Sequence, residues 1–279
     1  MSYAYRSPRN LRLEHVIDSP EFDSVSDLVS KVVDQMSENP LWFRGQPSHE
    51  YHLTPKLMRG DSRPMDEVYQ REARLVARFR ERSLPFWPAG YPQQPWEHLF
   101  SMQHHGVPTR LLDWSENLLV ATYFAATTPS PTESAKPTIW TLDPLGWNSR
   151  VPQLSDTGIG VLTVADEEAQ RWEPATSTGD RLAKRAKYPV ALYGVHNSPR
   201  IVAPRGTFTI AGDTWLGMDE LPCSEIDWSS YLTKYIFSGD REQLMKELRF
   251  LGFTESMIFP DLSSLAEELT LLEGWPSHG

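Results

Sequence analysis

The chain has 279 residues, of which 39% are hydrophobic and 23% are charged, so it is long and apolar enough to bury a sizeable core. This composition excludes a wholly disordered chain, a coiled coil and a collagen-like fibre. The 27 Lys and Arg residues against 37 Asp and Glu residues give a net charge of −10, which excludes a general electrostatic attraction to nucleic acid or to an anionic membrane.

The cysteine count and the hydropathy of the sequence limit the compartments and the structural classes that fit this protein. Cys223 is the only cysteine, so intrachain disulfides and cysteine-based zinc clusters are excluded. The N-terminal residues lack the apolar run of a secretory signal, and no stretch of about eighteen apolar residues is present to span a membrane. The sequence therefore predicts a soluble, cytoplasmic protein with no membrane partner.

The first half of the chain carries mainly helical signals. After an extended lead-in, residues 23–24 begin a helix that residues 39–40 end. The predicted apolar face of this helix consists of Val25, Leu28, Val29, Val32, Val33 and Met36. Residues 41–43 predict a short strand that residues 44–45 interrupt.

Proline and glycine delimit the next elements. Pro64 begins a helix with an apolar stripe and a solvated, arginine-rich face. Residues 84–95 contain four prolines and three aromatic residues, which predicts an ordered loop. A helix over residues 96–105 ends at Gly106, and Ser115 or Glu116 leads a helix over residues 118–126. The small packing positions of this last helix are Ala121 and Ala125.

The second half carries mainly strand signals. Short strands are predicted over residues 138–142, 160–164, 190–195, 201–203, 207–210 and 231–237. Helices are predicted over residues 241–251 and 262–272. We therefore expect one α+β domain that is helix-rich in its first half and built of mainly antiparallel strands in its second half.

The strongest local motif is residues 103–114, Gln-His-His-Gly-Val-Pro-Thr-Arg-Leu-Leu-Asp-Trp. Thr109, Arg110 and Asp113 stand in what is otherwise an apolar strand. Because a buried charge is costly unless it is paired, Arg110 and Asp113 each require a fixed partner. The motif indicates either a structural salt bridge or a functional site at this chain reversal.

A second motif is residues 42–46, Trp-Phe-Arg-Gly-Gln. Arg44 would offer a planar donor pair to a phosphate or carboxylate, and Gly45 would let the backbone approach such a ligand closely. The alternative is a buried Arg44 paired with an acidic residue such as Asp113. We predict that Arg44 and Asp113 lie in one pocket, which is also lined by Gln103, His104, Thr109 and Arg110.

The two adjacent histidines do not predict a metal site. On a helix, His104 and His105 point about 100° apart, so they are poorly placed to ligate one ion. No His-x-x-x-His spacing or carboxylate cluster accompanies them. We expect no metal.

These segments resemble the FRG domain, which takes its name from a phenylalanine-arginine-glycine step. The resemblance rests on residues 42–46, on residues 103–125 and on a later block, residues 200–208, in which Pro204 replaces a frequent glutamine. It spans about residues 41–259. We accordingly divide the chain into an N-terminal lead-in and helix, residues 1–40, and an FRG domain with C-terminal helices, residues 41–279.

The resemblance implies a bacterial or phage protein, such as a toxin or phage-defence effector, with a layout similar to ADP-ribosyltransferase-type folds. In those folds a first-strand arginine holds a phosphate or ribose of NAD, which by analogy is Arg44. A later strand with Ser or Thr, here Thr109, and the helix after Asn117 would form the nicotinamide side. No glutamate stands out near residues 200–210 to supply the activating carboxylate.

Three functions fit these residues. The first is an NAD-using enzyme that transfers ADP-ribose or hydrolyses NAD, with arginines on the pyrophosphate, aromatic residues around the nicotinamide, and a polar group at the developing oxocarbenium ion. The second is a non-catalytic module that binds a nucleotide, a nucleic-acid end or a protein partner. The third is a hydrolase or nuclease that depends on His104 and Asp113.

For the first function we assign each candidate residue a role. The predicted catalytic residues are Arg44, His104, Thr109 and Asp113. The predicted ligand-binding residues are Trp42, Gln46, Gln103, Arg110, Asn117, Tyr123 and Arg200, with Phe124 as a further wall of the nicotinamide slot. NAD is the expected substrate, and a macromolecule of unspecified identity is the expected acceptor.

Overall fold

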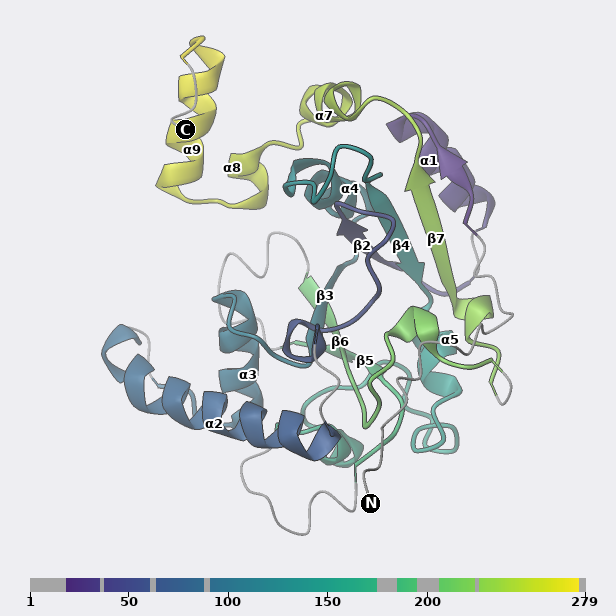
Figure 1. Ribbon diagram of the computed structural model, residues 1–279, viewed down its shortest axis with the longest axis vertical. Coiled ribbons are helices and arrows are strands. Elements are labelled where there is room, and N and C mark those ends of the chain that lie inside the picture. Colours follow the sequence, from purple (N-terminus) through teal and green to yellow (C-terminus); the bar gives the residue numbers. More distant parts are fainter. Residues whose placement is uncertain are drawn as a thin grey trace, which may run out of the picture.

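The computed structural model describes residues 19–35, 38–60, 64–87, 91–174, 185–194, 206–223 and 226–275. Its described strands form a single seven-stranded sheet in the order β1-β7-β4-β2-β3-β6-β5 (Figure 1). Only β1 and β7 pair in parallel, so the predicted antiparallel character is confirmed. The strands are β1 (Glu21–Phe22), β2 (Trp42–Gln46), β3 (Leu111–Ser115), β4 (Thr138–Leu142), β5 (Val190–Tyr193), β6 (Gly206–Ile210) and β7 (Leu232–Phe237).

Eight α-helices surround this sheet in the described part of the chain. Figure 1 shows α1, α4 and α7 together beside β4 and β7, and α2 and α3 at the other end of the sheet beside β6. The helices are α1 (Val25–Asp34), α2 (Met65–Ser83), α3 (Pro95–His104), α4 (Leu118–Thr127), α5 (Pro144–Ser149), α7 (Arg241–Phe250), α8 (Glu255–Ile258) and α9 (Leu262–Leu272). None of them is long and apolar enough to cross a bilayer.

The side chains of the central strands alternate between two apolar clusters. Trp42 and Trp140 point into a cluster with α3, α5 and β5, whereas Phe43 and Ile139 point into a cluster with α1, α4 and α7. This period of two is what an antiparallel sheet with both faces covered requires. Both faces of the sheet are therefore covered by apolar side chains of the surrounding elements.

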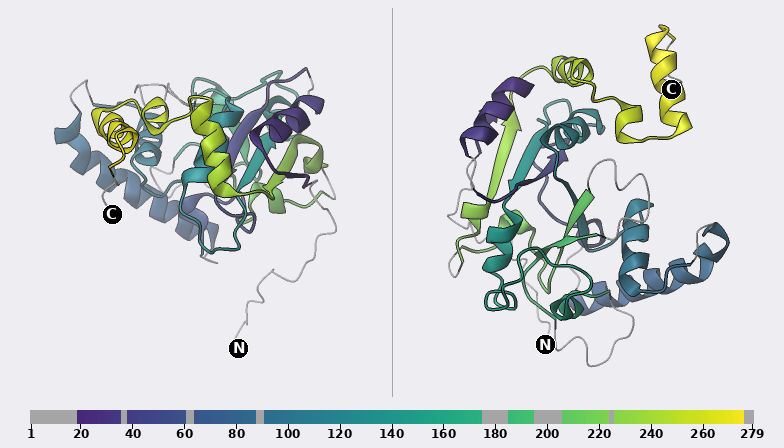
Figure 2. Two further views of the ribbon diagram at one scale, coloured as in Figure 1. Left: turned by 90° about the horizontal axis from the view of Figure 1, so that it is seen from above. Right: turned by 180° about the vertical axis from the view of Figure 1, so that it is seen from behind.

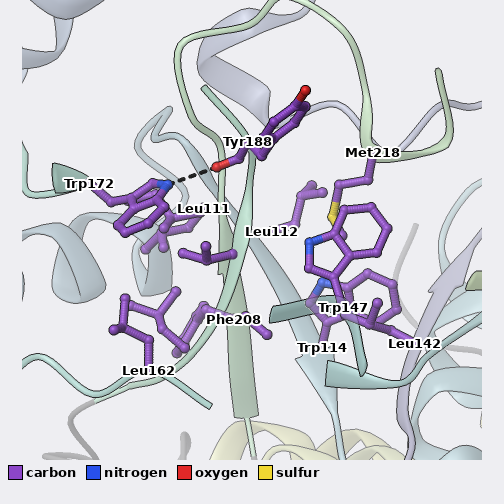
Figure 3. Packing of buried hydrophobic residues seen from close by; sticks show 14 of the residues in the cluster. Leu111, Leu112, Trp114, Leu142, Trp147, Leu162, Trp172, Tyr188, Phe208 and Met218 are labelled. Atoms are coloured by element: carbon purple, nitrogen blue, oxygen red, sulfur yellow. Dashed lines mark hydrogen bonds between the residues drawn. The ribbon is translucent and has the colours of Figure 1, made fainter. Parts of the chain in front are cut away.

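Several tryptophans belong to the first cluster and use their indole N–H groups inside it. Trp172 donates to the carbonyl of Tyr188 at 2.9 Å (Figure 3), and Trp114 donates to Oγ1 of Thr209 at 3.0 Å. Because a buried indole N–H without an acceptor is costly, these bonds make the large side chains compatible with a dry core.

The predicted elements are confirmed where their signals are local. β4 and α9 occupy the predicted residues 138–142 and 262–272, and α3 ends before Gly106, whose φ is +73°. The arginine-rich face of α2 is solvated, with Arg74, Arg78, Arg80 and Arg82 exposed.

Other predicted elements differ from the structure. The first half contributes more to the sheet than a helix-rich half suggests, because the strands predicted at residues 41–43 and around Asp113 are β2 and β3, at the centre of the sheet. Residues 160–164 form no strand and contribute only an isolated bridge from Leu162 to Leu192. In α1, Val29 and Val33 are exposed, so the buried face is narrower than predicted. The predicted strand over residues 201–203 and Met36 lie outside the described residues.

The step at Arg44 and Gly45 does not interrupt a strand; β2 runs through it. A Cβ added to Gly45 would lie 1.9 Å from the carbonyl oxygen of Ala121 and 2.7 Å from the nitrogen of Ala125. Gly45 thus lets the backbone of α4 pack directly on β2, a role that the sequence analysis did not predict; its close approach to a ligand stays a prediction. The predicted role of Ala121 and Ala125 as small packing positions is confirmed, since both are buried.

The Gly45→Ala substitution should destabilise the protein by about 3 kcal/mol or more, because backbone atoms of α4 cannot rotate away from a new methyl group. Gly252→Ala is the control: Gly252 has φ of +84° but open space around its Cβ position. Gly252→Ala should therefore lower the free energy of unfolding only through the left-handed backbone conformation, by about 1 kcal/mol. Urea denaturation of both variants measures the difference; equal losses would show that contact with α4 is unimportant.

Candidate functional site

A cleft of about 550 Å³ lies between β2, β3, α3 and α4, within the range of small-molecule sites. Its walls are largely aromatic. The aromatic lining residues are Phe43, Tyr51, Phe100, Trp114, Phe124, Phe208 and Phe259. Two aromatic pairs lie across the walls, Phe100 with Phe208 at 5.0 Å between ring centroids and Phe124 with Phe259 at 5.8 Å. Such walls suit a planar ligand.

Arg44 projects from β2 into this cleft, with 15% of its side chain exposed. Its Nη1 donates to the carbonyl oxygen of Asp113 at 2.6 Å and lies 4.0 Å from Oδ2 of the same residue. Its Nε is buried, and no described residue accepts a hydrogen bond from it. Burial lowers the pKa of Arg44, and the Asp113 carboxylate partly opposes this shift. Because this mostly buried charge is 4.0 Å from the nearest carboxylate oxygen, it is only partly compensated, and an anion bound in the cleft would be favoured.

The prediction that Arg44 and Asp113 share one pocket is confirmed. They lie on neighbouring strands: β2 and β3 pair at Phe43 and Ser115. The Asp113 side chain is 59% exposed, so its carboxylate is available to a ligand.

A chain of hydrogen bonds fixes the carboxylate of Asp113. The carboxylate of Asp113 can only accept, so the Gln103 amide turns its Nε2 toward it and donates to Oδ2 at 2.6 Å. The amide oxygen Oε1 then faces Thr109, whose hydroxyl donates to it. Oγ1 of Thr109 also accepts from the backbone N–H of Leu111 at 3.1 Å, which fixes the hydroxyl to the main chain.

Further polar and charged side chains that line the cleft come from α3 and from the chain after β2. His104 lines the cleft, as predicted, and so do Gln103 and His105, whose ring meets that of His104 edge-on at 5.0 Å. Arg59, which the sequence analysis missed, adds a second guanidinium to the lining and donates from Nε to the carbonyl of Thr54 at 2.9 Å. Two guanidinium groups and one carboxylate thus line the cleft among the described residues.

Arg110 does not line the cleft, and that prediction is wrong. Its side chain is fully buried, and Nε donates to Oε1 of Glu72 at 2.9 Å. Nη1 donates to the carbonyl of Ala211 at 2.6 Å, and Nη2 donates to that of Trp172 at 2.8 Å. Arg110 therefore joins α2, β3 and the chain before β5, which is the structural alternative left open by the sequence. The backbone brings Glu72 to it from 38 positions away.

Three other predicted site residues also lie away from the cleft. Thr109 is buried and acts through Gln103, and Trp42 is buried in the core, where its ring meets Tyr193 at 5.7 Å. Tyr123 is buried with α1 and α7, and burial raises its pKa. Trp42 and Tyr123 therefore cannot line a ligand slot here, whereas Phe124 can.

The remaining predicted residues have structural partners or are not described. Gln46 lines the cleft, but its Oε1 accepts from Nε1 of Trp140 at 2.8 Å and its Nε2 donates to the carbonyl of His52. Asn117 is the N-cap of α4, with Oδ1 accepting from the backbone N–H of Leu119 at 2.9 Å. The predicted caps Ser115 and Glu116 are therefore wrong. Arg200 lies outside the described residues.

In chemical terms, the cleft offers two guanidinium groups to an anion, aromatic walls to a planar group, and one oriented carboxylate to a developing positive charge. Within the described ranges, no group of three or more His, Cys, Asp or Glu side chains is arranged to hold a metal ion.

The comparison with protein families matches residues 39–134 to the FRG domain. This confirms an FRG domain in the chain over the two blocks that contain Arg44 and Asp113, and the extension of the resemblance to residue 259 stays a prediction. No curated protein and no solved structure matches the chain. The similarity to ADP-ribosyltransferases also stays a prediction.

The Arg110→Met substitution should cost about 3–5 kcal/mol of stability, because the buried carboxylate of Glu72 loses its guanidinium partner. The double variant Arg110→Met/Glu72→Met removes both charges and should recover part of this loss. Chemical denaturation with Arg78→Ala as an exposed control measures both effects. A double variant no more stable than the single one would contradict a direct coupling of these two residues.

Proposed function

We propose that the cleft binds NAD and that the protein cleaves the bond between nicotinamide and ribose, transferring ADP-ribose to water or to a macromolecular acceptor. The observation that carries this proposal is Arg44, whose guanidinium lines the aromatic cleft, 4.0 Å from the nearest oxygen of the oriented Asp113 carboxylate. Both residues lie within the segment that matches the FRG domain, and the choice of NAD follows the fold analogy of the sequence analysis.

The proposed ligand would use each part of the cleft. Arg44 and Arg59 would hold the pyrophosphate, because planar guanidinium groups bind phosphate oxygens in pairs. Nicotinamide would lie among the aromatic walls, of which Phe124 and Phe259 form one pair. This arrangement would leave the ribose beside Asp113.

The reaction needs little covalent chemistry from the protein. The bond from C1′ of the ribose to the nicotinamide nitrogen breaks, and its electron pair leaves with neutral nicotinamide. The Asp113 carboxylate would stabilise the positive charge that develops at C1′. Water or an acceptor hydroxyl then forms the new bond to C1′ and releases its proton to the solvent.

A non-catalytic nucleotide-binding module is the second candidate. It is favoured by the lining itself: no glutamate is among the described residues around the cleft, and Asp113 supplies its one carboxylate. Glu220, the first glutamate after β6 in the chain, accepts from the backbone N–H of Gly217 at 2.9 Å and does not line the cleft. The same arginine and aromatic groups would then serve binding alone. A toxin or phage-defence role, implied by the FRG resemblance, is compatible with either candidate.

Incubation of the purified protein with NAD, with free nicotinamide followed by chromatography, tests the proposal. Asp113→Asn should slow nicotinamide release about 100-fold while NAD binding changes little, because the amide keeps the shape and loses the charge. Arg44→Ala should weaken NAD binding about 10- to 100-fold, since it removes a charge-assisted contact. Its melting temperature should fall only slightly, whereas that of Arg110→Ala should fall strongly.

The exposed Arg78→Ala variant is the control and should behave as the wild type in all three measurements. NAD binding without nicotinamide release would rule out the proposed enzyme and support the non-catalytic binding module. Absence of NAD binding, or an Arg44→Ala variant that unfolds, would remove the proposal.

Thr109 is a positioning residue in this proposal and can be tested separately. Thr109→Val removes the hydroxyl that orients Gln103, so kcat should fall about tenfold while KM for NAD stays close to that of the wild type. Thr109→Ser keeps the hydroxyl and should restore kcat. Equal losses in both variants, or a rise in KM alone, would show that Thr109 only packs.

A further inference from the structure

Helix α9 exposes a row of leucines to solvent. The exposed fractions are 84% for Leu262, 43% for Leu265, 52% for Leu269 and 74% for Leu272. Figures 1 and 2 show α9 at the C-terminal corner of the molecule, projecting from the rim beyond α8. Large apolar side chains gathered on one exposed helix mark an interaction surface more often than leucines scattered singly.

The orientation of α9 is the reverse of an ordinary surface helix. Its buried residue is Ser264, and Glu268 accepts a hydrogen bond from Oγ of Ser256 on α8. The side of α9 with Ser264 and Glu268 therefore contacts its own protein, whereas the four leucines are exposed, as are Ser263 and Glu267. A helix that only covered the protein would turn these leucines inward, so they are available to a partner.

The four leucines form a continuous seam. They are spaced by three, four and three residues, and at 100° per residue they lie within a stripe about 80° wide. This is the pattern of anchors by which one helix fits an apolar groove. Glu268 borders the stripe on one side, and Glu273 borders it on the other.

Charge decides which partner fits this seam. Residues 250–279 contain no Lys or Arg, and their five acidic residues are Glu255, Asp261, Glu267, Glu268 and Glu273. A second copy would bring the same acidic flanks and a net charge of −10. Nucleic acid and anionic membranes would also be repelled. Only a basic partner has the complementary charge.

We propose that the leucine seam of α9 docks into an apolar groove of another protein whose rim carries Lys or Arg residues. Acidic flanks on both sides of the seam would steer such a partner and reject acidic grooves. The surface is separate from the cleft, since none of the seam leucines is among the residues that line it.

Two designed helical peptides of about 21 residues provide the probe. They share one leucine seam and differ in carrying Lys or Glu at the flanking positions. In fluorescence anisotropy with the full chain, the Lys-flanked peptide should bind at least tenfold more tightly. Leu265→Asn/Leu269→Asn should abolish binding without lowering the melting temperature, because both leucines are exposed in the folded protein. Leu251→Asn, an exposed leucine at the end of α7, is the matched control and should bind as the wild type.

A charge-reversal variant distinguishes the proposed charge-selective docking from non-specific hydrophobic binding. Glu268→Lys/Glu273→Lys should exchange the preference, so that the Glu-flanked peptide binds more tightly. Equal binding of both peptides, or no binding of either, would overturn the proposal. A wild-type chain that sediments as a dimer, with a monomeric Leu265→Asn/Leu269→Asn variant, would assign the seam to a second copy instead. Flotation of the wild type with vesicles would assign it to a lipid surface.

Discussion

The contact between Gly45 and the backbone of α4 determines the centre of this molecule. No side chain larger than hydrogen fits between β2 and the helix, so the two backbones meet directly at Ala121 and Ala125. This contact holds α4 across β2 and places Phe124 at the cleft. The same strand presents Arg44 one position earlier. The shape of the cleft therefore depends on a packing constraint at Gly45, a residue without a functional side chain.

Two arginines show how differently one side chain is used within this fold. The guanidinium of Arg110 is buried and donates to Glu72 of α2 and to backbone carbonyl groups. Its charge and its donors are therefore satisfied within the protein. Arg44 keeps one buried donor, Nε, without an acceptor among the described residues, and its side chain lines the cleft beside Asp113. Burial is costly in both cases, and the described residues compensate it less fully at Arg44 than at Arg110. Arg185 and Arg241 also keep a buried Nε without a described acceptor, so the position of Arg44 at the cleft, rather than this donor alone, supports the proposed binding role.

Sequence reasoning succeeded where the signal lay within a few neighbouring residues. Gly106 after α3 and the run of β-branched and aromatic residues in β4 specify their elements locally, and the charged residues in an otherwise apolar strand identified Asp113. It failed where the partner is distant in sequence. Nothing near Arg110 identifies Glu72, and nothing near Asp113 identifies Phe208, which pairs with it across β3 and β6. Arg59 carries no motif and reaches the cleft only through the fold.

The order of the strands has a consequence for the FRG match. The matched residues 39–134 contain β2 and β3, yet β2 needs β4 on its other side and β3 needs β6. A fragment cut at residue 134 would leave two bare strand edges with unpaired backbone groups and would expose Trp42 and Phe43. The segment that matches the FRG domain is therefore shorter than the segment that completes the sheet. Any sequence that replaced β4 or β6 would have to pair again with the exposed edge of β2 or β3.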